Sequence, residues 1–314
     1  MPTPPIRRNV RAPIITRRAL LGAAALLPLA ACTNGRLPPA VVAPSSSPDA
    51  ATNARHDRLV ELERKFDARL GVYALATGTG TSIAHRADEQ FAFCSTFKGL
   101  AVAAVLHRNP LSHLDTVVTY AADDLMKSSI ITRQHVTAGM TIGQLCDAAV
   151  RYSDGTAANL LLRDIGGPAQ LTAYARDLGD TVTRMDRFEP TITEATPGDP
   201  RDTTSPRAFG TDYQKVVLED ALSTEKRAFL RDLLERNATA AGAQRIRAGL
   251  PQGWTVADKT GTGDYGTLND IAIAWPPRSA PLVIAIMSSK ATKHAEYDQS
   301  LIAETAAYVA DTLT

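Results

Sequence analysis

The chain has 314 residues and a formal net charge of +1, from 34 basic and 33 acidic side chains. This length leaves room for one large domain or two smaller ones around an apolar core. The near-neutral balance argues against nucleic acid or an acidic polymer as a partner and favours a small neutral or anionic substrate. Three cysteines cannot form a disulfide framework, and we expect Cys94 and Cys146 to be buried free thiols rather than a bridged pair.

Residues 1–31 have the features of a processed leader. Arg17 and Arg18 precede an apolar run that is too short to span a bilayer of about 30 Å. The arginine pair resembles the twin-arginine signal for export of folded proteins, although an ordinary charged leader looks similar. Small residues precede Cys32, as at a bacterial lipoprotein cleavage site, and the alternative is a plain signal peptide cut near Ala31. We expect an exported protein of the periplasm or cell envelope, touching the membrane only through a lipid on Cys32.

The body of the chain is expected from residue 54, after a flexible tether over 32–53 that is too rich in Pro, Ala and Ser to order itself. Periodicity and capping residues predict helices over 56–68, 96–107, 142–152, 156–164, 169–178, 211–222, 223–236 and 297–313. Alternating or β-branched runs predict strands over 71–77, 81–85, 254–262, 271–275 and 282–288.

Strands at both chain ends and helices between them predict an α+β fold with three layers, α/β/α. Its antiparallel sheet would come from residues 54–92 and 240–314, and a mostly helical domain, residues 93–239, would be inserted between them. Within the helical domain, residues 186–206 predict an irregular loop. A loop of about 20 residues inside a compact domain is usually functional.

Ser95 and Lys98 stand three residues apart at a predicted helix start, a spacing that brings two side chains into hydrogen-bonding range. A serine needs such a neighbour because its free hydroxyl is a weak nucleophile. The helix N-terminus also directs backbone N–H groups at developing negative charge. The pattern alone is weak, because Ser223 to Lys226 matches it too and is interpreted as a helix cap.

Two further motifs follow downstream. Ser153 opens a Ser-Asp-Gly triplet between two predicted helices, which in isolation would be interpreted as a helix cap. Lys259, Thr260 and Gly261 lie on a predicted strand, where a cation and a hydroxyl can bind an anion and the glycine lets a ligand approach the backbone. The alternative interpretation of the same triplet is a strand edge with a glycine bulge.

In this order the three motifs resemble the S-x-x-K, S-D-N and K-T-G set of class A β-lactamases and penicillin-binding proteins. The likeness extends from about residue 56 to the C-terminus. It implies that Ser95 attacks the β-lactam carbonyl and that Lys98, or Glu189 through a water, takes its proton. Ser153 would pass a proton to the departing nitrogen. The substrate would be a penicillin or a related antibiotic.

The 186–206 loop distinguishes the two families. In class A enzymes a glutamate at the place of Glu189 activates the water that hydrolyses the acyl-enzyme, whereas a transpeptidase lacks it and stays acylated. Arg187 and Asp202 match an ion pair that joins the ends of this Ω-loop. Asn159 matches a residue that supports the loop from the helix beneath. The resemblance also implies a cis peptide bond before Pro190.

The resemblance also implies a substrate-binding strand. The N–H groups of Ser95 and Thr262 would form the oxyanion hole, and Lys259, Thr260 and Thr262, along the strand with Gly261, would hold the substrate carboxylate. Arg245 matches an arginine that assists this carboxylate in one branch of the family, and it would otherwise be a surface arginine.

Three positions depart from the family pattern, and the Ser-Asp-Gly triplet in place of Ser-Asp-Asn resembles the mycobacterial and actinobacterial branch. Gly155 replaces an asparagine that contacts the lysine and the substrate amide, which predicts weaker amide recognition and a wider site. Ser128 replaces an aromatic gate, which again predicts a roomier entrance. Thr193 replaces an asparagine that helps to hold the hydrolytic water, which predicts slower turnover.

Two other readings remain open. A D,D-peptidase acting on peptidoglycan stems would use the same chemistry with slow deacylation. A non-catalytic scaffold lipoprotein would be expected to have lost Ser95 or one of the two lysines. The six histidines are scattered without a zinc-binding pattern, and no G-x-S-x-G elbow is present. We expect no metal and no cofactor, and a monomer whose partner is the small β-lactam.

Overall fold

A computed structural model describes residues 48–314, with side chains from residue 57 onward. The leader, Cys32 and most of the predicted tether lie outside the described residues. The first helix, α1 (Pro48–Phe66), begins earlier than predicted, so residues 48–53 are helical rather than part of the tether. Proline is preorganised for the first helical turn and alanine is a strong helix former, which accounts for the earlier start.

One five-stranded sheet is built from both ends of the chain, as predicted. Its strands are β1 (Arg69–Ala76), β2 (Ser82–His85), β7 (Thr255–Gly263), β8 (Thr267–Trp275) and β9 (Leu282–Ser289). Their order is β2-β1-β9-β8-β7, and every neighbouring pair is antiparallel. The α+β class is therefore confirmed.

Strand β9 shows why the sheet is covered on both faces. Val283, Ala285 and Met287 belong to one apolar core, whereas the intervening Leu282, Ile284 and Ile286 belong to another. Successive side chains of a strand point to opposite faces, so each face of β9 supplies its own core. An apolar sheet of this kind needs a helical layer on each side.

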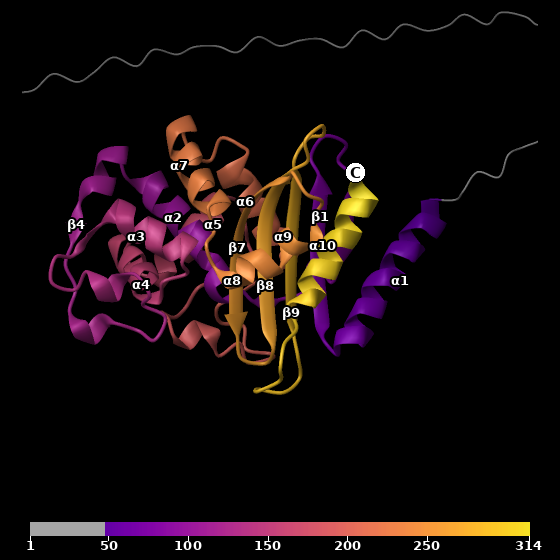
Figure 1. The fold of residues 1–314 in the computed structure, drawn as a ribbon, viewed down its shortest axis with the longest axis horizontal. Helices are drawn as coiled ribbons and strands as arrows, with labels where there is room; N and C mark the ends of the chain where they lie inside the picture. The colour runs from indigo at the N-terminus through magenta and orange to yellow at the C-terminus, as the bar shows by residue number, and fades with distance from the viewer. Residues whose placement is uncertain (1–47) are drawn as a thin grey trace, which may run out of the picture. The chain divides into compact units, whose positions relative to one another are not determined.

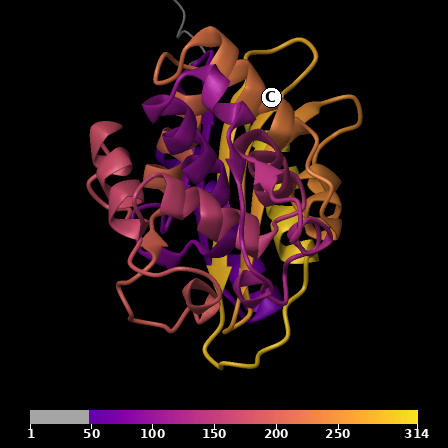
Figure 2. The same ribbon diagram turned by 90° about the vertical axis from the view of Figure 1, so that its left-hand side faces the viewer.

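Figure 1 shows these two layers on either side of the sheet, and Figure 2 shows the larger layer facing the viewer. The larger helical layer contains α2 (Phe97–Arg108), α3 (Ile142–Arg151), α4 (Gly155–Asp164), α5 (Pro168–Asp177), α6 (Pro206–Val217) and α7 (Thr224–Glu235). The opposite layer contains α1, α9 (Ile246–Gly249) and α10 (Ser300–Leu313), with the short α8 (Ala240–Gln244) leading into α9. None of the helices described has an apolar stretch long enough to span a membrane.

Besides the start of α1, two boundaries differ clearly from the sequence prediction. Helix α6 begins five residues before residue 211, because Ser205 Oγ accepts a hydrogen bond from the N–H of Ala208 at 3.2 Å and Pro206 fills the first helical position. Strand β8 begins at Thr267 rather than at residue 271. The prediction began too late because the buried polar Asn269 and Asp270 interrupt the apolar pattern of the strand. Helices α8 and α9 were not predicted from the sequence, because each is too short to show a period.

Two-residue strands attach the Ω-loop to the body. Strand β3 (Phe91–Ala92) pairs with β6 (Thr203–Thr204), which lies near the end of the loop. A second small pair joins β4 (Val117–Val118) to β5 (Met140–Thr141). Cys94 and Cys146 are buried free thiols, as predicted. The described residues, 48–314, belong to one compact unit, and the division at residues 92/93 and 239/240 stays a prediction.

Candidate active site

Ser95 lies in a tight turn between strand β3 and helix α2. The 3-10 helix Cys94–Thr96 precedes α2, and Cys94 has a positive φ of 48°. The hydroxyl of Thr96 donates to Phe93 O at 2.6 Å, and Tyr213 from α6 donates to Thr96 O at 2.7 Å. These bonds on both sides of the serine hold its backbone in place at the start of α2.

Ser95 and Lys98 meet at Glu189 rather than at each other. Ser95 Oγ donates to Glu189 Oε1 at 3.1 Å, and Lys98 Nζ lies 2.6 Å from the same oxygen. Among the described residues no hydrogen bond joins Ser95 directly to Lys98, so the contact expected from helical spacing is replaced by a shared carboxylate. Lys98 is 1% exposed and Glu189 is 8% exposed, so this ion pair is nearly shielded from water.

Ser153 lies between the two buried lysines. Its hydroxyl oxygen is 3.3 Å from Lys98 Nζ and 3.1 Å from Lys259 Nζ, and its carbonyl accepts from Lys98 Nζ at 2.7 Å. The backbone of Ser153 has a positive φ of 57°. Asp154, the next residue, is the helix cap considered from the sequence, since its side chain accepts from the N–H of Ala157 at 3.0 Å. One triplet therefore both caps α4 and directs a hydroxyl at two amines.

Lys259 projects from β7 into the same site. It is fully buried, and its ammonium donates to Thr260 O at 2.9 Å as well as to Ser153. Burial and the nearby Lys98 cation lower the pKa of Lys259 to about 7, because both disfavour a second charged amine. Its charge is therefore sensitive to pH in the neutral range.

The Ω-loop positions Glu189 through its backbone. Asn159 of α4 accepts from the Glu189 N–H and donates to its carbonyl, each at 3.0 Å. This paired contact fixes the residue from the helix beneath, as predicted for Asn159. The peptide bond between Glu189 and Pro190 is cis, as the resemblance implied.

The ends of the loop are joined by Arg187 and Asp202, again as predicted. Arg187 Nε lies 2.5 Å from Asp202 Oδ2, and the side chain of Asp202 is 1% exposed. Asp202 Oδ1 also accepts from the N–H groups of Asp186 and Arg187, at 2.8 and 3.0 Å. A buried carboxylate with several donors is held firmly, so the loop has a fixed geometry at its base.

Gly261 lets β7 pass directly against the nucleophile. A Cβ at this position would lie 2.7 Å from Phe93 O and 3.2 Å from Ser95 N, distances that a side chain could not adopt without displacing backbone. Thr262 follows Gly261 on β7. The strand that is expected to supply one N–H of the oxyanion hole therefore runs beside the N–H of Ser95.

Arg245 is fully buried and is not a surface residue. Its Nη2 donates to Thr262 Oγ1 at 2.6 Å, and its Nη1 donates to Gly261 O at 2.7 Å. Gln299, which the sequence analysis did not single out, accepts from Arg245 Nε at 2.6 Å. Nothing in the sequence connects these two residues, which only the fold brings together. Arg245 therefore reaches the binding strand through Thr262.

The space beside the α-carbon of Gly155 is occupied by the Ser128 hydroxyl. A Cβ on Gly155 would lie 2.4 Å from Ser128 Oγ and 3.1 Å from Glu189 Oε2. The glycine thus lets the Ser128 hydroxyl approach the backbone of α4. The hydroxyl of Thr193, the third departure from the family pattern, donates to Pro190 O at 2.7 Å.

Replacing Gly155 with Asn is expected to lower kcat/KM by about tenfold, because the new side chain must displace Ser128 and crowd Glu189. In a Ser128→Gly background the same replacement is expected to cost less than about threefold, since the obstructing hydroxyl is gone. Steady-state hydrolysis of a penicillin by the two single variants and the double variant measures this coupling between positions 155 and 128. Additive effects of the two substitutions would contradict it.

The comparisons with known proteins agree with this geometry. A model of the β-lactamase enzyme family matches residues 54–313. A β-lactamase of Mycobacterium tuberculosis is 58% identical, covering 82% of this chain and 85% of that protein. A β-lactamase of Amycolatopsis lactamdurans is 51% identical, covering 83% and 85%. The crystal structure of a class A β-lactamase from Clostridium kluyveri is 44% identical, covers 83% of this chain and 98% of that one, and superposes with a TM-score of 0.81. The chain belongs to the class A β-lactamase family.

Proposed function

We propose that this protein hydrolyses the β-lactam ring of penicillins and related antibiotics through an acyl-enzyme on Ser95, released by a water that Glu189 activates. The observation that carries the proposal is the position of Glu189 Oε1, 3.1 Å from Ser95 Oγ and 2.6 Å from Lys98 Nζ. A buried carboxylate beside both the serine hydroxyl and the amine can accept a proton at either chemical step.

In acylation, Ser95 Oγ attacks the lactam carbonyl carbon as its proton moves to the Glu189 carboxylate or to the neutral amine of Lys98. The carbon–nitrogen bond of the ring then breaks, and the nitrogen takes a proton from Ser153 Oγ, which the two lysines can resupply. The N–H groups of Ser95 and Thr262 are proposed to stabilise the oxyanion. In deacylation, Glu189 takes a proton from water as the water oxygen attacks the ester carbonyl. The bond between this carbon and Ser95 Oγ then breaks, and Ser95 Oγ takes the proton back from Glu189.

The substrate carboxylate is proposed to bind along β7. Lys259 supplies a cation, and Thr260 and Thr262 supply hydroxyls. Arg245 supports this site by donating to the Thr262 hydroxyl, which leaves the hydroxyl proton free to point at the substrate. Arg245 is therefore a positioning residue, and it adds positive charge beneath the strand.

Mass spectrometry of the protein mixed with benzylpenicillin tests the proposal and separates it from a D,D-peptidase. We expect a penicilloyl adduct that disappears within seconds while penicilloic acid accumulates. An adduct that persists for many minutes would identify a peptidase-like enzyme. Absence of any adduct and of any hydrolysis would leave only the scaffold interpretation.

The Michaelis constant for benzylpenicillin is expected to rise about tenfold between pH 6 and pH 9, equivalent to ~1.4 kcal/mol of binding free energy. The reason is that the pKa of Lys259 is lowered to about 7, so its ammonium is present below that pH and lost above it. A penicillin methyl ester, which lacks the carboxylate, serves as the matched probe and should show a much flatter profile. A Michaelis constant that falls with rising pH would contradict the assignment.

We also propose that the protein is an exported monomer, anchored at Cys32 by a lipid after removal of a twin-arginine leader. The support is the sequence pattern around Arg17, Arg18 and Cys32. Replacing Cys32 with Ala should move the protein from the membrane fraction to the soluble fraction. Replacing the arginine pair with lysines should block export.

A further inference from the structure

The segment that leads into the proposed nucleophile is held to the five-stranded sheet by one side chain, Asn269 of β8. Its amide nitrogen donates to Ala92 O at 2.8 Å and to Phe93 O at 3.1 Å, and its oxygen accepts from the N–H of Ser288 at 3.4 Å. Asn269 is fully buried, and these contacts use both N–H groups of the amide and its oxygen. Among the described residues, no other group of the sheet forms a hydrogen bond with residues 91–96.

Asn269 can reach this segment because its neighbour on β7 is a glycine. Gly261 pairs with Asn269 in the β7–β8 ladder, and directly opposed residues share one face of a sheet. A Cβ on Gly261 would lie 2.7 Å from Phe93 O, the same carbonyl that the amide binds. A Cβ on Gly263 would lie 2.7 Å from Cys94 Sγ. The two glycines therefore let the turn lie directly against β7, and the amide beside them holds it there.

The position of the Phe93 carbonyl determines where the Ser95 N–H points. A peptide unit is planar, so a bond that holds Phe93 O also fixes the plane that contains the N–H of Cys94. Only the two backbone dihedral angles of Cys94 separate this plane from the next one, which contains the Ser95 N–H. Cys94 has a φ of 48°, a conformation that a residue with a side chain keeps only where its surroundings enforce it. Asn269 and the Thr96 hydroxyl, both donating to Phe93 O, supply that constraint.

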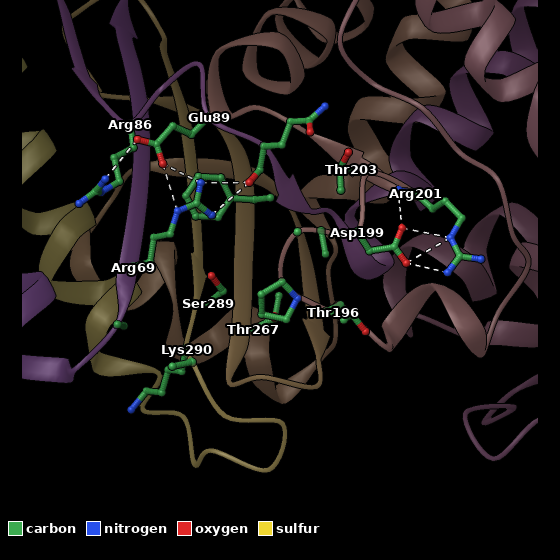
Figure 3. Close-up of a pocket in the computed structure, with 18 of the residues that line it drawn as sticks. Arg69, Arg86, Glu89, Thr196, Asp199, Arg201, Thr203, Thr267, Ser289 and Lys290 are labelled. Carbon is green, nitrogen blue, oxygen red and sulfur yellow. Dashed lines mark hydrogen bonds and ion pairs between the residues drawn. The ribbon is translucent and has the colours of Figure 1, made fainter.

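A cavity borders the same segment. Its volume is about 1020 Å³, and Ala92 is one of the residues that line it. Thr203, which pairs with Ala92 in the β3–β6 ladder, and Thr267 at the start of β8 also line the cavity, as Figure 3 shows. Packed side chains therefore do not confine the segment at the cavity. Removal of the Asn269 amide is expected to let the segment shift toward this space and away from β7.

We propose that Asn269 is a positioning residue that sets the separation between the two N–H groups of the oxyanion hole, those of Ser95 and Thr262. Thr262 belongs to β7, to which Asn269 is joined through the β7–β8 ladder. Ser95 follows the two carbonyls that the amide holds. One buried side chain thus connects both halves of the hole. The inference rests on the proposed function, because the oxyanion hole is part of that proposal.

Asn269→Ala removes the amide and tests the proposal. Its kcat/KM for benzylpenicillin is expected to fall at least about 30-fold, because a displaced oxyanion-hole donor stabilises the transition state poorly. Phenylboronic acid probes the hole without turnover, since its boron bonds to a serine oxygen and the tetrahedral anion resembles the transition state. Its affinity is expected to fall at least about tenfold. Hydrogen exchange of the backbone amides in 91–97, measured without ligand, is expected to become faster.

Ser288→Ala is the matched control, because it also removes a buried hydrogen bond from the sheet. The Ser288 hydroxyl donates to Leu268 O at 3.0 Å. Asn269 pairs with Met287, so the side chain of the next residue, Ser288, points to the opposite face of the sheet from the turn. Both variants should melt at a lower temperature than the unmodified protein. The control should keep its kcat/KM and boronate affinity within about threefold and its exchange in 91–97 unchanged.

The proposal is overturned if Asn269→Ala matches the control in any of the three measurements. Asn269→Ser keeps a polar group that is too short to reach the two carbonyls, so it should show the same losses and replaces the alanine variant if that one does not fold. If neither variant folds, Asn269 is a folding residue and the proposal is overturned. An unmodified protein that neither hydrolyses benzylpenicillin nor binds the boronic acid would overturn the proposed function and this inference with it. A failure confined to the Asn269 variants overturns this inference alone.

Discussion

A Glu189→Gln variant mixed with benzylpenicillin is expected to accumulate a penicilloyl adduct that persists for hours. The amide keeps the shape of the side chain but cannot accept a proton from water, so deacylation should fall by about 10²–10⁴-fold. Acylation should survive, because the amine of Lys98, in its neutral form, is the second base proposed for the Ser95 proton. Intact-protein mass spectrometry, sampled from seconds to hours, measures both steps.

Two comparisons sharpen this result. Glu189→Ala should trap the same adduct. Its free energy of unfolding should fall by about 3–5 kcal/mol, because the buried Lys98 loses its only carboxylate partner in the described structure. Glu194→Ala, an exposed glutamate of the same loop, should change turnover by less than about threefold. A Glu189→Gln variant that forms no adduct would show that Glu189 is indispensable for acylation as well.

Replacing Ser95 with Ala should abolish the adduct and lower kcat/KM by at least about 10³-fold, because the variant lacks the proposed nucleophile, the hydroxyl that donates to Glu189. The second S-x-x-K match supplies the control. Ser223 lies at the exposed start of α7, where its hydroxyl contacts Glu225 at 3.2 Å. Ser223→Ala should leave activity and acylation unchanged. Residual adduct formation in Ser95→Ala would mean that another residue is the nucleophile.

Much of the fold was accessible from the sequence, because strand alternation and helical spacing are local properties. Helix α6 and strand β8 were misplaced where a cap and buried polar residues overrode the apolar pattern. The pairing of β3 with β6 could not be predicted, since two-residue strands carry no period.

The candidate site likewise combines features that the sequence predicted with contacts that only the fold creates. The order of motifs identified Ser95, Lys98, Ser153, Lys259 and Glu189. Their contacts were less predictable, because helical spacing placed Lys98 beside Ser95 whereas the fold brings Glu189 between them. The burial of Arg245 and the approach of Ser128 to Gly155 depend on segments that are remote in sequence. Such tertiary contacts leave no local pattern.

The sheet order has a consequence for how the chain reaches its native state. Strand β1 lies between β2 and β9, and Ala76 pairs with Leu282 across most of the body. Pairings this distant in sequence form slowly, because a long loop must close before any contact is gained. During synthesis the edge of β1 stays unpaired until the last strand has emerged, and an open strand edge is prone to aggregate. Completion of the sheet must therefore follow synthesis of the C-terminal strand and helix, and a chain cut short before Leu282 would leave β1 and β8 as open edges.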